Sequence, residues 1–214
     1  LKTPLTSMKV LADSLMGQED IPVELYREFM TDIGAEIDRE NKIINDLLSL
    51  VKMDKSAGNI NITSVQINEL LERIMKRLRP IAQKQNVELV MESFRPVVAE
   101  VDEVKLTLAL TNLIENAIKF NKPGGGVCVA VSQKGDDFEF IVKDNGPGIE
   151  KIEQALQPYS KEGTQPYDGT GIGIGLAVAQ GIVEAMEGHM EVKSRKDYGT
   201  EVRVSFGLKK ECVG

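Results

Sequence analysis

The first 53 residues place apolar side chains at helical spacing. Met8, Leu11 and Leu15 recur every three or four residues, and a polar stretch with Gly17 then interrupts them. A second helix is predicted to begin near Pro22, and its apolar stripe comprises Phe29, Met30, Ile33, Ile37, Ile44, Leu47, Leu48 and Val51. Two helices alone cannot bury both stripes. They must cover another domain or pair with a second copy in a four-helix bundle, and the length of the stripe favours the second copy.

The pattern changes after a polar, glycine-containing segment at residues 55–63, which reads as a linker. Helices are predicted at 64–85, from Asp102 as N-cap to about Phe120, and at 173–187. Short apolar runs predict strands at 87–91, 97–101, 127–132, 138–142, 190–194 and 201–206. The predicted class is α+β, with a helical hairpin at 1–54 and an α/β sandwich at 64–208. In the sandwich, helices cover one face of a mixed sheet. Residues 209–214 form a tail.

Composition narrows the possible functions. The chain has 214 residues of which 42% are hydrophobic, enough for a packed core in one or two domains. It has no run near the roughly 20 apolar residues that a membrane-spanning helix needs. One His and two Cys argue against a Cys/His zinc site, and a reducing compartment is the default. The net charge of −7 disfavours broad binding to nucleic acid. Because the chain begins with Leu1, we expect a fragment of a longer protein.

A segment at residues 112–121, NLIENAIKFN, places three polar side chains on one helix face. Asn112, Asn116 and Lys119 are four and three residues apart, while apolar residues take the other face. Two carboxamides and an ammonium group suit phosphate oxygens and a hard cation such as Mg²⁺. A solvated polar stripe is the alternative explanation.

Two glycine-containing segments follow. In KDNGPGI, residues 143–149, Asp144 stands at the end of an apolar strand, where its carboxylate can accept from an exocyclic amino group; a simple turn is the alternative. In GTGIGIGLA, residues 169–177, alternating glycines open a helix whose N–H groups favour an anion; a flexible hinge is the alternative. The second segment lacks the Gly-Lys-Ser/Thr of a Walker sequence, and no strand directly precedes it as in a dinucleotide fingerprint.

Taken together and in this order, the three segments resemble the ATP-binding domain of sensor histidine kinases, within the superfamily of gyrase, heat-shock chaperone and mismatch-repair ATPases. The resemblance covers about residues 64–208. LKTPLTSM at residues 1–8 resembles the end of the family's phosphoacceptor pattern, His-Glu-x-x-Thr-Pro-Leu. The His and Glu would lie directly before Leu1, so the resemblance implies that this chain alone cannot autophosphorylate. DLLSLVKMD at residues 46–54 resembles the second dimerisation helix.

The resemblance implies a role for each matching residue around ATP and Mg²⁺. At the base, Asp144 would accept from the adenine amino group, Gly146 and Gly148 would let the chain bend, and Thr200 would close the adenine site. At the phosphates, Asn116 would bind Mg²⁺, and Asn112 and Lys119 would contact the phosphates or the metal's water. The remaining implied nucleotide contacts are Phe120, Asn121, Gly171, Gly173, Gly175 and Leu176. Thr3 would position water for dephosphorylation of a response regulator, or would be a helix-start hydroxyl.

The sequence departs from the family's pattern in the lid. Leu156, Pro158, Tyr159, Lys161 and Tyr167 replace the usual Phe-rich box without a close match. Gly169 adds a fourth glycine to the run, so the run can be aligned with the family's pattern in two ways that differ by two residues.

The predicted function is transfer of the γ-phosphoryl group of ATP to a histidine and then to an aspartate of a response regulator receiver domain. Hydrolytic relatives carry a water-activating glutamate where this chain has Asn112, and Glu115 points about 100° away from Asn116 on a helix. A hydrolytic ATPase and a non-catalytic or anti-sigma-type regulator are the alternatives. We expect a homodimer through residues 1–54, no nucleic acid partner and no membrane contact by these residues. They would form the cytoplasmic portion of a parent that could be an inner- or plasma-membrane sensor.

Overall fold

The structure is a computed structural model, and it describes residues 9–10, 12–14, 22–35, 37, 60–93, 95–135, 137–156 and 175–207. Residues 9–10, 12–14, 23–35 and 37 are helical, in agreement with the two helices predicted from the apolar spacing. Pro22 directly precedes the second helical stretch, where its missing N–H costs no hydrogen bond. Among the described residues, no helix combines the length and apolarity needed to cross a membrane.

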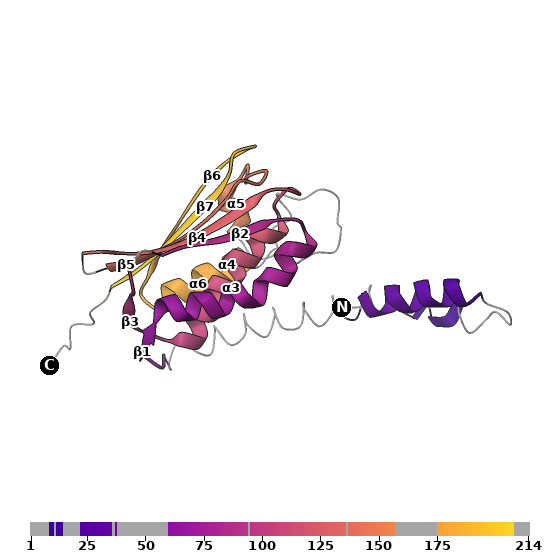
Figure 1. The fold of residues 1–214 in the computed structure, drawn as a ribbon, viewed down its shortest axis with the longest axis horizontal. Coiled ribbons are helices and arrows are strands. Elements are labelled where there is room, and N and C mark those ends of the chain that lie inside the picture. The colour runs from indigo at the N-terminus through magenta and orange to yellow at the C-terminus, as the bar shows by residue number, and fades with distance from the viewer. Residues whose placement is uncertain are drawn as a thin grey trace.

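The rest of the described chain is an α/β domain with helices packed on one face of a sheet (Figure 1). Its helices are α3 (Ile67–Lys84), α4 (Glu103–Lys119), the single turn α5 (Ile152–Ala155) and α6 (Gly175–Ala185). Its strands are β1 (Thr63–Gln66), β2 (Glu88–Ser93), β3 (Val98–Val101), β4 (Gly126–Lys134), β5 (Asp137–Asp144), β6 (His189–Arg195) and β7 (Gly199–Gly207).

Five strands form the main sheet in the order β2-β4-β5-β7-β6. β2 pairs with β4 in parallel and the other neighbours are antiparallel, so the sheet is mixed, as predicted. The inner face is apolar because alternate residues of each strand point the same way. In β5, Phe138, Phe140 and Val142 are buried, and Phe138 stacks on Phe206 of β7 at 5.3 Å between ring centroids.

Helix α4 is the central helix of the layer. Leu106, Leu110, Leu113, Ile114 and Ile118 are buried along it, at the three- and four-residue spacing that its sequence shows. Asp102 caps its first turn as predicted, since the carboxylate accepts from the Lys105 N–H at 3.0 Å. The second carboxylate oxygen of Asp102 accepts from the Asn61 N–H at 3.1 Å. The start of α4 is therefore tied to the chain segment that precedes β1.

The helix predicted at residues 64–85 was wrong in its first three residues. Thr63–Gln66 form strand β1, which pairs antiparallel with β3 in a separate two-stranded sheet. Helix α3 begins only at Ile67, whose N–H donates to the Val97 carbonyl at 2.9 Å. Val65 is buried in this small sheet, so a long-range pairing overrides the local helical pattern. Thr63, predicted to belong to the linker, is already part of the domain.

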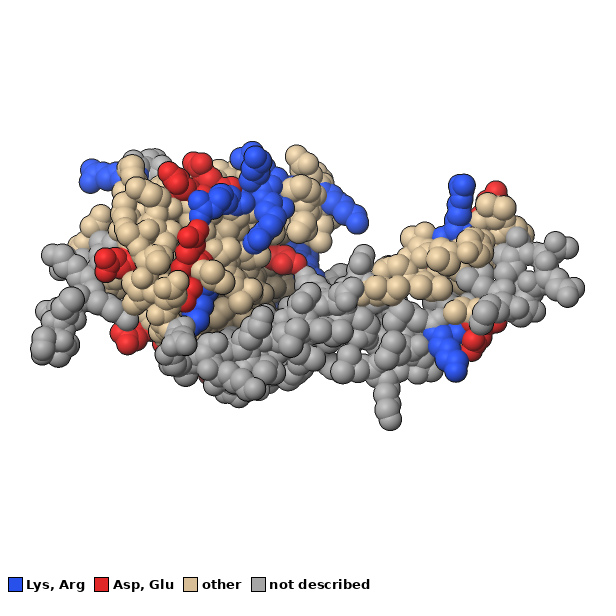
Figure 2. Space-filling view, turned by 90° about the horizontal axis from the view of Figure 1, so that it is seen from below, with Lys and Arg blue, Asp and Glu red and all other residues tan. Residues whose placement is uncertain are grey.

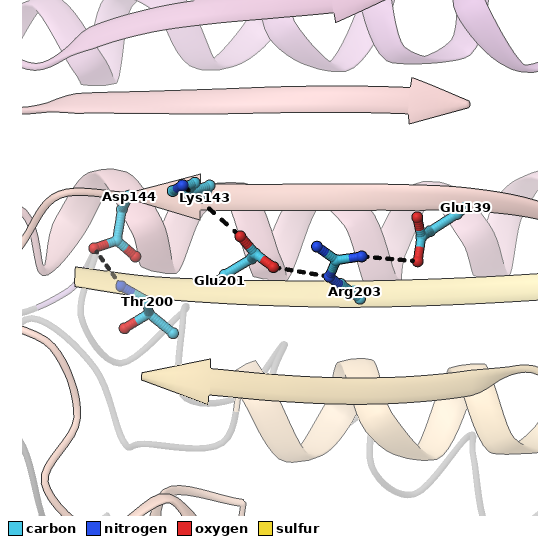
Figure 3. Close-up of polar contacts among 6 residues, drawn as sticks. All are labelled: Glu139, Lys143, Asp144, Thr200, Glu201 and Arg203. Atoms are coloured by element: carbon cyan, nitrogen blue, oxygen red, sulfur yellow. Dashed lines mark hydrogen bonds and ion pairs between the residues drawn. The ribbon is translucent and has the colours of Figure 1, made fainter. Parts of the chain in front are cut away.

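The outer face of the main sheet carries charged residues in pairs, and Figure 3 shows one row of them on β5 and β7. Glu201 lies 3.9 Å from the Lys143 amine and 2.7 Å from Nε of Arg203, whose guanidinium is 3.5 Å from Glu139. Cross-strand pairs of opposite charge keep this outer face compatible with water while the inner face is buried. Figure 2, which is seen from below the view of Figure 1, shows that positive and negative residues are also interspersed on that other side of the molecule.

Candidate functional site

The first part of the site is a carboxylate held by backbone N–H groups. Asp144 is the last residue of β5, as predicted, and its Oδ1 accepts from the Gly146 N–H at 2.8 Å. The same oxygen accepts from the Thr200 N–H at 3.2 Å (Figure 3). Among the described residues, both hydrogen bonds reach Oδ1, and Oδ2 has no protein donor. One oxygen is therefore fixed by the fold while the other remains available to accept from a ligand.

Two glycines allow the backbone to come this close to Asp144. A Cβ on Gly199 would lie 2.0 Å from the Asp144 carbonyl oxygen, and the φ of Gly199 is +103°, a region that side chains disfavour. A Cβ on Gly146 would lie 3.0 Å from Oδ1 of Asp144 and 3.1 Å from the Phe120 carbonyl oxygen. The prediction that Gly146 lets the chain bend here agrees with this geometry, whereas the need for Gly199 was not recognised from the sequence.

The turn after β5 rests on the hairpin between β6 and β7. Gly148 has a φ of +74°, and a Cβ there would lie 2.2 Å from the Arg195 carbonyl oxygen. The Asp197 N–H donates to the Pro147 carbonyl at 2.7 Å, and the Ile149 N–H donates to Oγ of Ser194 at 2.7 Å. Ser194 was missed by the sequence reasoning. The signal that could have found it is the hairpin itself, whose turn at residues 195–199 places Ser194 opposite Thr200.

The second part of the site lies where α4 meets the start of α6. A Cβ on Gly175 would lie 2.8 Å from Nδ2 of Asn116 and 3.3 Å from Oδ1 of Asn112. The two asparagines thus lie on one face of α4, as predicted, with the N-terminus of α6 directly against them. Asn112 also donates to the Leu108 carbonyl at 2.9 Å, which ties its amide to its own helix. Free N–H groups at a helix start and carboxamide oxygens beside them suit phosphate and a hard cation.

The end of α4 connects the two parts. Phe120 is 39% exposed, and the Lys119 amine lies 5.3 Å from its ring centroid. Asn121 donates to the Gly126 carbonyl at 3.1 Å, so its amide supports the start of β4. Asn145 makes two hydrogen bonds to Gly126. Its Oδ1 accepts from the Gly126 N–H at 2.8 Å, and its own N–H donates to the Gly126 carbonyl at 3.3 Å. This support role of Asn121 and Asn145 was not predicted.

Several predicted roles cannot be read from these contacts. Leu176 is half-buried and packs against the hydrophobic core, and its predicted nucleotide contact stays a prediction. Thr3, Gly171, Gly173 and the predicted lid lie wholly or largely outside the described residues, so their predicted roles stay predictions.

Burial changes the acidity of Asp144. Loss of solvent raises the pKa of this carboxyl above its ordinary value, and the hydrogen bonds from the Gly146 and Thr200 N–H groups oppose that rise. A half-buried carboxylate with fixed geometry is a good acceptor for one specific donor, since water competes weakly at such a position.

Comparison with known protein families identifies both regions of the chain. Residues 101–210 match the family of histidine kinase-, DNA gyrase B- and HSP90-like ATPases, and residues 1–56 match the His kinase A phospho-acceptor domain. The ATPase match contains α4, Asp144, Gly175 and Thr200, the elements that build the site. The chain therefore belongs to the sensor histidine kinases, with a phosphoacceptor domain followed by an ATPase domain.

Individual relatives agree with this assignment. The cell-division control histidine kinase PdhS of Brucella anthropi is 28% identical over 226 residues, which cover 96% of this chain and 21% of PdhS. The chain thus spans about a fifth of the length of the curated relatives it matches. Among solved structures, the Acinetobacter baumannii histidine kinase AdeS superposes with a TM-score of 0.79 at 16% identity, covering 98% of this chain and 97% of AdeS.

A second solved structure is that of the histidine kinase ThkA in complex with the response regulator protein TrrA. It superposes with a TM-score of 0.75 at 17% identity, covering 97% of this chain and 58% of that one. At these identities the superpositions establish the fold, which is the predicted helical hairpin plus α/β ATPase domain.

The phospho-acceptor match bears on one prediction from the sequence. Because that match starts at residue 1 and extends to residue 56, it gives no support to the expectation that this chain cannot autophosphorylate. That expectation stays a prediction.

Proposed function

We propose that this chain binds ATP with Mg²⁺ and transfers the γ-phosphoryl group to a histidine of a phosphoacceptor helix, from which it passes to an aspartate of a response regulator receiver domain. The observation that carries the proposal is that one site combines a fixed carboxylate, Asp144, with a second part formed by Asn112, Asn116 and Gly175. The first suits a base with an amino group, and the second suits phosphates.

At the base end, Oδ2 of Asp144 would accept from the exocyclic amino group of adenine. Its partner oxygen already has two backbone donors, so the carboxylate cannot rotate away without losing both. Gly146 and Gly199 let the two backbone segments lie directly against Asp144, which keeps its carboxylate in this position. Thr200 contributes its backbone N–H to Asp144 and would close this side of the site.

At the phosphate end, the side-chain oxygen of Asn116 would bind Mg²⁺ together with phosphate oxygens. Amide oxygens are hard ligands of the kind this cation prefers, and Mg²⁺ usually binds to a few protein groups plus substrate phosphates. The cation would neutralise charge on the phosphates during transfer. Asn112, the Lys119 amine and the N–H groups at the start of α6 would hold the phosphates in place, with Gly171 and Gly173 extending that contact.

The chemistry proposed is transfer to an imidazole nitrogen. That nitrogen attacks the γ-phosphorus, the bond from phosphorus to the β–γ bridging oxygen breaks, and ADP leaves with the electron pair. A carboxamide at position 112 cannot deprotonate water, and its Nδ2 already donates a hydrogen bond to the Leu108 carbonyl. Asn112 thus favours transfer over hydrolysis. The match of residues 1–56 to a phospho-acceptor domain supports transfer further and argues against a compact anti-sigma-type regulator.

The first 54 residues would dimerise. In the described part of the second helix, Met30 and Ile37 are each 47% exposed, although they lie on the predicted apolar stripe. A second copy would cover them in a four-helix bundle. Sedimentation of the Met30→Glu, Ile37→Glu double variant should give monomers, while the exposed control Thr31→Glu should leave the dimer intact. A dimer in the double variant would contradict this interface.

The test of the kinase proposal supplies the acceptor. The chain would be extended by a short helix-forming leader that ends in His-Glu directly before Leu1, with an Ala-Glu leader as the matched control. Both, and the original chain, would be incubated with γ-labelled ATP and Mg²⁺. The expected result is acid-labile label on the His-Glu version alone, since the one histidine of the original chain, His189, lies at the start of β6.

The outcomes separate the candidate functions. Label on the His-Glu version that moves to an added receiver domain supports the whole sequence of transfers. Rapid release of free phosphate without labelled protein would favour a hydrolytic ATPase. Stable label on the original chain would overturn the expectation that it cannot autophosphorylate, and acid-stable label on an added protein's serine would favour the anti-sigma-type reading.

A further inference from the structure

Ser194 makes three hydrogen bonds next to the site, and the proposed function gives it no role. It lies on β6 directly opposite Thr200 of β7, and it is half-buried. Its hydroxyl accepts from the Ile149 N–H at 2.7 Å, lies 2.9 Å from the Thr200 hydroxyl and donates to the Gly199 carbonyl at 3.1 Å. A hydroxyl has one proton and two acceptor positions, so these three bonds use its full capacity.

These bonds join the two segments that hold Asp144. Ile149 belongs to the turn whose Gly146 N–H donates to Oδ1 of Asp144, and Thr200 donates its own N–H to the same oxygen. The two donors are 54 residues apart in sequence, and the Ser194 hydroxyl is one hydrogen bond from each of their segments. Asp144, Gly146, Ile149, Ser194 and Thr200 thus form a closed loop of contacts, which we call the Ser194 network.

We propose that Ser194 is a positioning residue for recognition of the base: through the Ser194 network it fixes the orientation of the Asp144 carboxylate and so sets the preference for a base with an exocyclic amino group. The inference rests on the proposed function, in which Asp144 accepts from that amino group. A carboxylate accepts hydrogen bonds and donates none, so a fixed carboxylate favours an amino group and repels a carbonyl oxygen at the same ring position. A carboxylate that is free to rotate can turn away from the carbonyl oxygen, which weakens this discrimination.

The experiment compares binding of ADP and inosine diphosphate, which carries a carbonyl oxygen where adenine carries the amino group. Calorimetric titration would give the ratio of the two dissociation constants for the original chain and for Ser194→Ala. We expect Ser194→Ala to weaken ADP binding about fivefold to tenfold, the equivalent of one or two hydrogen bonds, and inosine diphosphate binding by less than about twofold. The preference for ADP should fall accordingly.

Three further variants complete the experiment. Ser205→Ala removes a hydroxyl of the same kind from β7, away from the network, and should leave the ratio unchanged. Ser194→Thr keeps the hydroxyl and should retain most of the preference. Ser194→Cys keeps the size but bonds weakly, so it provides the same comparison if Ser194→Ala fails to fold. Asp144→Asn should abolish the preference altogether.

The results distinguish the inference from the function on which it rests. A preference for ADP that depends on Asp144 but survives loss of the Ser194 hydroxyl overturns the inference alone. Equal weakening of both nucleotides in Ser194→Ala also overturns it, because that result indicates only a general structural role. If the original chain binds both nucleotides equally, or Asp144→Asn keeps the preference, the proposed function at the base end fails and the inference fails with it.

Discussion

The two ends of the site are built in different ways. At the base end, strand register and backbone N–H groups hold Asp144, and glycines at 146 and 199 admit the neighbouring backbone. At the phosphate end, side-chain amides of Asn112 and Asn116 face the start of another helix. A backbone contact cannot adapt to a change, whereas a side chain can rotate. We therefore expect changes at the base end to affect folding and selectivity, and changes at the phosphate end to affect mainly phosphate and metal binding.

The largest effect is expected from Gly199→Ala, with Gly175→Ala as its counterpart at the phosphate end. The new Cβ at 199 would meet the Asp144 carbonyl oxygen at 2.0 Å in a backbone conformation that alanine disfavours, so the free energy of unfolding should fall by about 3 kcal/mol or more. At 175 the Cβ would meet the movable Asn116 amide at 2.8 Å, and the loss should stay below about 1 kcal/mol. Urea denaturation measures both. Similar losses would remove the distinction between the ends.

Asp144→Asn is expected to have the next largest effect, on binding rather than folding. The amide oxygen can still accept from the N–H groups of Gly146 and Thr200. The amide NH₂ group would then face the amino group of adenine, and two donors cannot form a hydrogen bond with each other. ADP binding should weaken about 100-fold, or about 2.7 kcal/mol. Asp137→Asn, an exposed change on the same strand, is the control. ADP affinity that stays within threefold in Asp144→Asn would contradict the role of this carboxylate.

Asn116→Ala should have a smaller effect that depends on the metal. Titration with ATP in Mg²⁺ should show about tenfold weaker binding, because one metal ligand is lost. Without Mg²⁺, ADP binding should change by less than about twofold, since the base end remains intact. Gln180→Ala removes an exposed carboxamide from α6 and serves as the control. An equal loss with and without Mg²⁺ would argue that Asn116 supports the fold rather than the cation.

The smallest expected effect is a dependence of ADP binding on pH. Burial raises the pKa of Asp144, so protonation begins at a higher pH than for an ordinary aspartate, and ADP affinity should decline by a few-fold on acidification. Because the folded state binds this proton more tightly than the unfolded state, the ionised carboxylate costs stability above its folded pKa, and that cost disappears as pH falls. Asp144→Asn should give a flat profile, and a slope that persists in this variant would assign the effect to another group.

The parts of the molecule that followed from the sequence are those with local causes. The apolar spacing of α4 and the position of Asp102 before it predicted that helix and its cap, and the position of Asp144 after an apolar run predicted its place at a strand end. Helices on one face of the sheet were also predicted, and the structure places charged residues such as Glu201 and Arg203 on the other face.

What the sequence did not reveal depends on contacts between distant segments. Strand β1 is held by its pairing with β3, some 35 residues later. The local pattern of residues 64–66 contains no sign of that pairing, and it therefore predicts the start of a helix. Ser194 joins a turn 45 residues earlier to the facing strand, and hydrogen bonds of that range have no signature in spacing. The close approach of Gly175 to Asn116 depends on how two helices pack, which the glycine run alone does not specify.

The hydrogen bond from Asn61 to Asp102 has a mechanical consequence. It fastens the chain segment that precedes β1 to the first turn of α4, at a buried carboxylate that also caps this helix. Asn116 lies 14 residues further along the same helix, about 21 Å away at the rise of an α-helix. Because a helix resists stretching and compression along its axis, we expect a displacement of the chain at Asn61 to move the amides of Asn112 and Asn116 as well.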